Sequence, residues 1–122
     1  PHNYQPNCVA YTGTHDNDTA WGWYRTTCSE KEKAFLHRYL DCDDSHIAYR
    51  MIRAVWSSVA KISIAPLQDF LDLGSEARMN FPGKASGNWS WRVDAAQINS
   101  ELAGKIRELN ELYSRLKEEP VD

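Results

Sequence analysis

The sequence has 122 residues, which is enough for one domain and too few for most large enzyme folds. Its 14 Lys and Arg residues face 17 Asp and Glu residues, so a net charge of -3 leaves no basic excess for a phosphate backbone, and no nucleic-acid partner is expected. The three cysteines show no C-x-x-C spacing, which indicates neither a disulfide framework nor a zinc site and fits a reducing compartment.

The sequence contains no targeting or membrane signal. No apolar run approaches the roughly 20 residues of a membrane span. The opening residues PHNYQPN lack the basic and apolar parts of a signal peptide. We therefore expect a cytoplasmic protein without membrane contact. Because no repeat, low-complexity segment or linker interrupts residues 1–122, a single unit is expected.

The first half of the chain begins with a predicted strand. Residues 8–12, CVAYT, form a short apolar run that is typical of a buried strand. The loop THDND, residues 14–18, follows directly. Asp18 is expected to cap a short helical turn, and Ser29 with Glu32 forms an S-x-x-E capping box for a helix that ends in the acidic stretch DCDD.

The second half of the chain is predicted to contain a helix, a strand, a long loop and a final helix. Ser45 is expected to open a helix with one apolar face, and residues 61–65, KISIA, form a second apolar run that predicts a buried strand. Residues 74–91 are rich in Gly, Asn and Ser, and loops above about 15 residues in compact domains tend to be binding or lid elements. A final amphipathic helix is predicted from Asp94 to about Glu118, with its apolar stripe assigned to packing.

The order of these elements indicates an α/β fold built from successive β/α units with parallel strands. In such folds the chemistry lies at the C-terminal ends of the strands. The two unusual loops, residues 13–18 and residues 74–91, both lie after predicted strands. We therefore expect a functional site at this edge of the sheet.

His15, Asp16 and Asp18 allow three interpretations. A metal site, and with it a metal-dependent hydrolase, is disfavoured because adjacent strand residues point to opposite faces and no second His/Asp pair lies nearby. In a purely structural interpretation, the aspartates cap a turn. In the third, a carboxylate accepts two vicinal hydroxyls and an imidazole donates to a sugar oxygen. The five tryptophans and six tyrosines favour this carbohydrate interpretation, although the roles of Trp21 and Trp23 stay open.

Three segments carry a family resemblance. YTGTHDNDT, then GWY, then ISIAPLQDFLDLGSEARMNFPGKASGNWSWR resemble, in this order, the C-terminal part of the amylomaltases, the 4-α-glucanotransferases also called disproportionating enzymes. The resemblance covers nearly the whole chain. It implies an α/β chain that forms the last two β/α units of a (β/α)8 TIM-type barrel, incomplete by itself and helix-rich, since such a barrel needs roughly 250 residues. PHNYQPN resembles the cyanobacterial or plastid type, which implies a plastid location if the source is a plant.

The resemblance implies an activity and a set of site residues. The family transfers α-1,4-glucan segments between maltooligosaccharides with retention, in starch and glycogen metabolism, and needs no metal or other cofactor. Asp16 resembles the catalytic carboxylate that stabilises the oxocarbenium-like transition state, and His15 resembles the histidine beside it. Asn80 and Ser86 resemble residues that line the sugar subsites. We also expect Trp89, on the same loop, to bind substrate.

The nucleophile and the acid/base of the family belong to earlier barrel strands, and no carboxylate of this chain lies in their motifs. Glu76 is a possible substitute, but Arg78 two residues away indicates an ion pair instead. We therefore expect the isolated chain to be inactive, and to self-associate or pair with the missing N-terminal part of the barrel through exposed Trp56, Val59 and Ile62. The alternative is a stand-alone glucan-binding module without catalysis.

Overall fold

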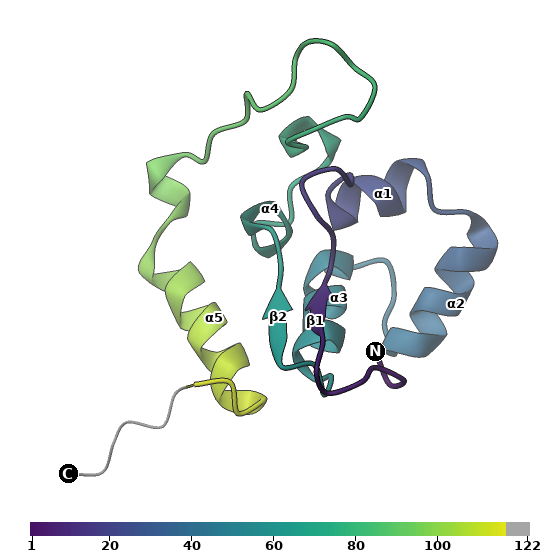
Figure 1. Cartoon of the computed structure of the whole chain (residues 1–122), viewed down its shortest axis with the longest axis vertical. Helices are drawn as coiled ribbons and strands as arrows, with labels where there is room; N and C mark the ends of the chain where they lie inside the picture. Colours follow the sequence, from purple (N-terminus) through teal and green to yellow (C-terminus); the bar gives the residue numbers. More distant parts are fainter. Residues whose placement is uncertain (117–122) are drawn as a thin grey trace. The chain divides into compact units, whose positions relative to one another are not determined.

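The computed structural model describes residues 1–116, and the contacts divide the chain into two compact units, residues 1–92 and residues 93–122. Figure 1 shows the order of the elements along the chain. Within the described residues, no helix has the length and apolar character needed to cross a membrane.

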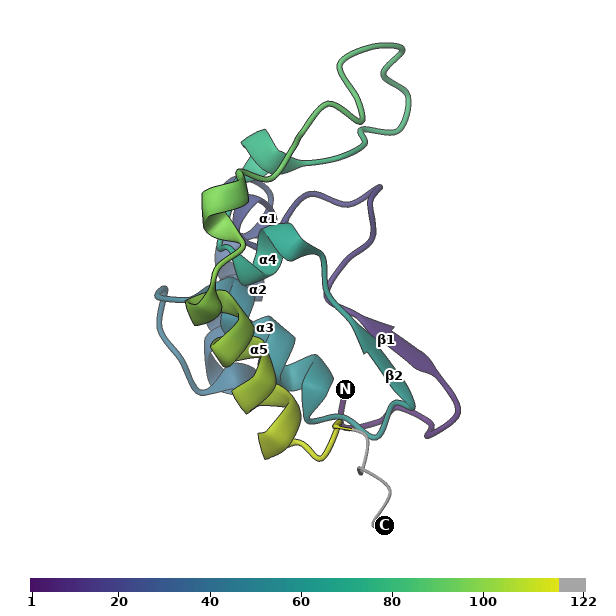
Figure 2. The same cartoon turned by 90° about the vertical axis from the view of Figure 1, so that its left-hand side faces the viewer.

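The first unit is built around a two-stranded parallel sheet. β1 (Val9–Tyr11) pairs with β2 (Ile62–Ile64), with Ala10 opposite Ser63. Figures 1 and 2 both show the strands side by side. The predicted parallel pairing is confirmed, and each strand is one residue shorter at each end than the sequence indicates. Parallel strands need a long crossover, which the helices between them supply.

The two faces of the sheet differ in burial. Ala10 is buried, and the Ser63 hydroxyl donates to the carbonyl of Val55 in helix α3 at 3.1 Å, so this face is covered. Because side chains alternate along a strand, the opposite face carries Val9, Tyr11, Ile62 and Ile64, whose exposed fractions lie between 42% and 48%. The prediction of fully buried strands is wrong for this face, because the two-stranded sheet buries one face only.

Three helices connect the strands: α1 (Ala20–Thr26), α2 (Glu30–Leu40) and α3 (Ile47–Trp56). The predicted capping box at the start of α2 is confirmed, because Ser29 and Glu32 each accept the other's backbone N–H. The predicted cap of α1 is wrong. Thr19, not Asp18, accepts the N–H of Gly22 at 3.0 Å.

Helix α3 begins two residues after its expected start. Ser45 donates to the carboxylate of Asp43, and His46, with a φ of 55°, turns the chain into the helix. The buried face of α3 carries Ile47, Ile52, Val55 and Trp56, as the apolar spacing predicts, together with Ala48.

The predicted exposure of Trp56 is wrong, because its ring packs edge-on against Phe70 at 5.7 Å between ring centres. Val59 and Ile62 are exposed, as expected. Trp21 and Trp23 are half-buried, and both pack against the cluster formed by Tyr24, Cys28 and Ile47. Both tryptophans therefore contribute to packing.

Short helices follow β2. α4 (Leu67–Phe70) lies directly after the strand, and the 3-10 turn η1 (Ser75–Ala77) opens the long loop. Gly22 in α1 lies against this turn. A Cβ on Gly22 would lie 2.5 Å from the Ser75 hydroxyl and 2.8 Å from the Ser75 backbone nitrogen, so this close approach requires glycine.

The second unit contains the 3-10 turn η2 (Ala95–Gln97) and helix α5 (Ser100–Leu112). Asp94 caps η2, and Asn99 caps α5, so the expected continuous helix from Asp94 is two elements. Leu102 and Leu109 of the apolar stripe are buried, whereas Ile98, Leu112 and Leu116 are exposed. The predicted end near Glu118 lies outside the described residues.

Candidate functional site

The loop after β1 is held at both ends by one buried carboxylate. Asp69 of α4 accepts the hydroxyl of Thr12 at 2.7 Å and the backbone N–H of Ala20 at 2.8 Å. Its exposed fraction is 2%. Burial raises the pKa of Asp69 and outweighs the two hydrogen bonds, which act in the opposite direction. Asp69 thus fixes where the loop leaves the sheet and where it enters α1.

Local hydrogen bonds shape the loop itself. Asn17 closes a turn by accepting the backbone N–H of Thr14 at 2.8 Å. Asp18 accepts the N–H of Thr19 at 2.8 Å and the hydroxyl of Ser75 at 2.7 Å, which ties the loop to η1. The carboxylate of Asp18 therefore has a structural role that differs from the expected cap: it serves the scaffold rather than a site shared with His15.

His15 and Asp16 occupy the exposed part of the loop. Their side chains are 56% and 51% exposed, and the His15 Nε2 atom lies 3.4 Å from Asp16 Oδ1. Both groups are therefore accessible to a ligand.

The second loop reaches the first through Asn80. Its side-chain amide donates to Asp16 Oδ1 at 2.7 Å, and its backbone N–H donates to the carbonyl of His15 at 3.1 Å. In the described part of the chain, Asp16 Oδ2 accepts no hydrogen bond. Asn80 thus holds one carboxylate oxygen of Asp16 and leaves the other available.

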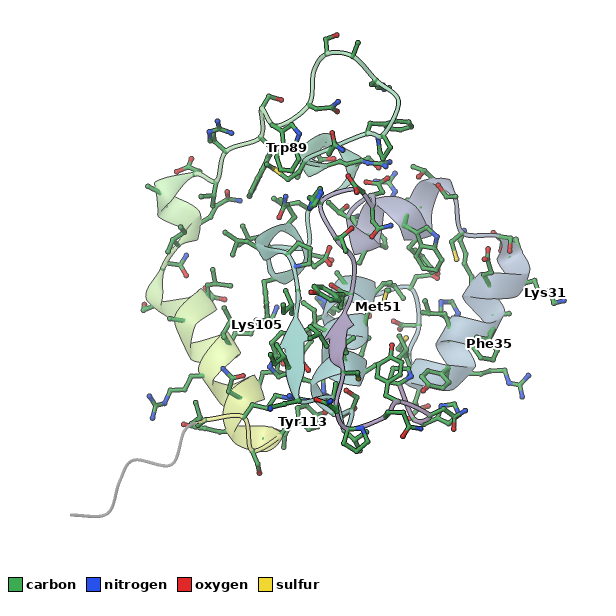
Figure 3. The ribbon with its side chains drawn as sticks, viewed as in Figure 1. Lys31, Phe35, Met51, Trp89, Lys105 and Tyr113 are labelled. Atoms are coloured by element: carbon green, nitrogen blue, oxygen red, sulfur yellow. The ribbon has the colours of Figure 1, made fainter. Side chains whose placement is uncertain are left out.

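Trp89 completes this cluster. Its ring centre lies 5.1 Å from that of His15, and the two planes are tilted by 42°. The residue has a φ of 60°, its N–H donates to the carbonyl of Met79 at 2.7 Å, and its side chain is exposed. Figure 3 shows Trp89 beyond the C-terminal ends of both strands. We name His15, Asp16, Asn80 and Trp89 the carboxylate cluster.

An open cleft of about 420 Å³ lies beside the cluster. Tyr11 and Ile64 at the ends of the two strands line it, together with His15 and Arg78. The site therefore lies at the strand edge that the sequence indicates, where apolar strand side chains meet polar loop side chains.

Four of the five predicted site residues meet in this cluster. Ser86 does not. It is exposed in the long loop, and within residues 1–116 its side chain makes no hydrogen bond to the cluster.

The predicted ion pair between Glu76 and Arg78 does not form. Glu76 accepts the backbone N–H of Gly74 at 2.9 Å, and the Arg78 guanidinium donates to two backbone carbonyls, those of Asp16 and Asn80. Arg78 and Asp69 are the site-forming residues that sequence reasoning missed. No motif signals them, because three of their four partners are backbone carbonyl or N–H groups, which the residue types do not reveal, and the fourth, the Thr12 hydroxyl, lies far away in sequence.

The described residues contain no cluster of side chains suited to metal binding. Nowhere in the described residues do three or more His, Cys, Asp or Glu side chains lie close enough together to hold a metal ion. His15, Asp16 and Asp18 in particular do not converge, because Asp18 is bonded to Thr19 and Ser75.

A carboxylate, an imidazole, an amide and an exposed indole thus lie together beyond the C-terminal ends of two parallel strands, the edge at which α/β folds carry their functional sites. The chain belongs to the 4-alpha-glucanotransferase family, whose model matches residues 1–98. The resemblance seen in the sequence is thereby confirmed.

Two relatives and one solved structure show the extent of the match. The chain is 50% identical over 116 residues to a 4-alpha-glucanotransferase of Clostridium butyricum, covering 94% of this chain and 24% of that protein. It is 48% identical over 117 residues to a 4-alpha-glucanotransferase of Synechocystis, covering 94% and 23%. An amylomaltase from Streptococcus agalactiae, solved in complex with acarbose, matches with a TM-score of 0.89 and 31% identity, covering 96% and 24%. The chain thus spans about a quarter of the length of these relatives.

Proposed function

We propose that this chain forms the last two β/α units of the (β/α)8 barrel of a 4-α-glucanotransferase, which transfers α-1,4-glucan segments between maltooligosaccharides with retention. The observation that carries this proposal is the carboxylate cluster, which two loops assemble at the C-terminal strand edge of a chain from this family. The chain covers about a quarter of the length of its relatives, which supports the view that it is one part of a larger barrel.

In this proposal Asp16 stabilises positive charge in the transition state. Retaining transfer passes through an oxocarbenium-like state, and hydrogen bonds to sugar hydroxyls strengthen as that charge develops. Asn80 orients Asp16 through Oδ1, while Oδ2 is available to accept a hydroxyl. The ring N–H of His15 donates to an oxygen of the same sugar, and the indole face of Trp89 packs against the apolar face of the pyranose.

In this proposal the nucleophile and the acid/base come from other parts of the barrel, because no carboxylate of this chain lies in the family's motifs for these two groups. The other carboxylates that build the loop scaffold are already engaged. Asp18 is bonded to Thr19 and Ser75, and Asp69 is buried beneath the loop. Asp16 alone can stabilise charge but cannot perform both covalent steps.

The test is disproportionation of maltotriose by the full-length natural protein that contains this chain, with the isolated 122-residue chain assayed at equal molarity. We expect the full-length protein to produce glucose and longer maltooligosaccharides, and the isolated chain to produce neither. Transfer by the isolated chain would contradict the fragment proposal. Saturable maltotriose binding by a natural protein that consists of this chain alone, without any transfer, would instead support the stand-alone glucan-binding alternative.

We also propose that the isolated chain self-associates or pairs with the missing part of the barrel. The exposed sheet face formed by Val9, Tyr11, Ile62 and Ile64 supports this, because unpaired edges and uncovered apolar faces promote association. A groove of about 960 Å³, which Tyr11, Phe35 and Met51 help to line, adds apolar surface near β1.

Light scattering after size exclusion is expected to give a mass well above the 14.0 kDa of one chain. A monodisperse monomer would count against this association.

A cytoplasmic location, or a plastid location in a plant, remains a proposal that rests on the family resemblance.

A further inference from the structure

Arg78 joins the two loops that carry the carboxylate cluster. Its Nη2 donates to the backbone carbonyl of Asp16 at 2.7 Å, and its Nε donates to the backbone carbonyl of Asn80 at 2.8 Å. These two acceptors belong to loops that follow different strands. The guanidinium carbon also lies 4.2 Å from the ring centre of Phe81, so the group packs over this ring.

Only an arginine side chain satisfies this geometry. The planar guanidinium presents several N–H donors in a rigid fork, so one group can bind two acceptors in fixed directions. A lysine ammonium is a compact point charge on a flexible stem and lacks this planar array. Because both acceptors are backbone carbonyls, the contacts fix the main chain at Asp16 and Asn80.

The side chains at these two positions depend on that placement. The amide of Asn80 reaches Asp16 Oδ1 at 2.7 Å, and a shift of one loop relative to the other would lengthen this bond. One further contact, from the Asn80 N–H to the His15 carbonyl at 3.1 Å, crosses between the loops nearby. Arg78 lies on the second loop, so its bond to the Asp16 carbonyl crosses between the loops, whereas its bond to the Asn80 carbonyl holds the second loop in shape. With the two contacts of Asn80, three hydrogen bonds join the loops around the cluster.

We propose that Arg78 is a positioning residue for glucan transfer: it clamps the two loops together, and thereby sets the orientation of the Asp16 carboxylate toward the sugar. It acts through Asp16 and Asn80. This inference rests on the proposed function, because the effect on rate has meaning only if the full-length protein is a transferase.

The first test is Arg78→Lys in the full-length protein. We expect kcat for maltotriose disproportionation to fall on the order of 100-fold, as misplacement of a reacting group by about 1 Å can do. The KM should change by less than about threefold, because the residues that touch the sugar are retained. Arg38→Lys, a matched change at an exposed position of α2, should leave both constants unchanged.

A second variant separates clamping from general folding. In Arg78→Ala, added guanidinium ion at low, non-denaturing concentration is expected to raise kcat at least about tenfold above that of the variant alone, because the ion replaces the missing donors. Hydrogen exchange supplies a readout without activity. The amides of Asn80 and Trp89 should exchange faster in Arg78→Lys, while Ile52 in the core of α3 keeps its protection.

The outcomes distinguish the two proposals. An active wild-type protein whose kcat and loop exchange are unaffected by Arg78→Lys would overturn the clamp. A uniform loss of protection that includes Ile52, without rescue by guanidinium, would assign Arg78 a general folding role and also overturn it. If the wild-type protein shows no transfer, the proposed function fails, and faster exchange confined to the two loops would still support the clamp itself.

Discussion

Asp16→Asn in the full-length protein is expected to lower kcat for maltotriose disproportionation on the order of 1,000-fold, equivalent to about 4 kcal/mol of transition-state stabilisation. The amide keeps the shape of the side chain but removes the negative charge that, in the proposed function, stabilises the developing positive charge of the sugar. It also replaces one acceptor oxygen with a donor, either beside the amide of Asn80 or toward the sugar hydroxyl. Steady-state kinetics with maltotriose measures this effect directly.

Asp72→Asn is the matched control. Asp72 is exposed and has a φ of 55°, a left-handed conformation that asparagine also adopts readily, so this variant should keep wild-type kcat. If Asp16→Asn retained kcat within about threefold of the wild type, Asp16 could not be the charge-stabilising group.

Asp69→Ala is expected to destabilise the full-length protein by about 2 to 4 kcal/mol, because it leaves the N–H of Ala20 and the hydroxyl of Thr12 without their buried acceptor. Asp69→Asn should cost less than about 1 kcal/mol. Its carbonyl can accept the Ala20 N–H, and its amide can donate to the Thr12 hydroxyl, which then acts as the acceptor. Urea unfolding followed by tryptophan fluorescence compares the two variants. Equal destabilisation by both would contradict the role assigned to Asp69.

The stability of Asp69→Asn relative to the wild type is expected to change with pH in a defined direction. Burial raises the pKa of Asp69 in the folded protein above its ordinary value of 3.8. The unfolded chain therefore loses this proton at lower pH than the folded protein does, and the wild type loses stability as the pH rises through that interval. The stability of Asp69→Asn relative to the wild type should increase over the same interval and then level off. A relative stability that decreases with rising pH would show that the folded pKa is lowered.

Local sequence signals predicted the elements that depend on neighbouring residues. The S-x-x-E pattern at Ser29 and Glu32 identified the start of α2, and the apolar spacing identified the buried face of α3. The position of His15 and Asp16 also followed from the sequence, since parallel strands bring their C-terminal ends to one edge.

Features set by contacts between distant segments could not be predicted in this way. Asp18 is a good helix cap in isolation, but Ser75 engages its carboxylate, so Thr19 takes that position. Arg78 lies near Glu76 in sequence, yet it binds carbonyls of two loops. The apolar runs of β1 and β2 indicate burial on both faces, but burial of the second face needs partners that the two-stranded sheet does not provide.

The proposed function requires the carboxylate cluster to bind a glucose unit of an α-1,4-glucan. A crystal structure of the full-length protein with acarbose tests it most directly. We expect a sugar hydroxyl within hydrogen-bond distance of Asp16 Oδ2, a ring oxygen or hydroxyl at His15, and the face of a sugar ring against Trp89. Acarbose bound elsewhere in the barrel, with no contact to Asp16 or His15, would contradict the account.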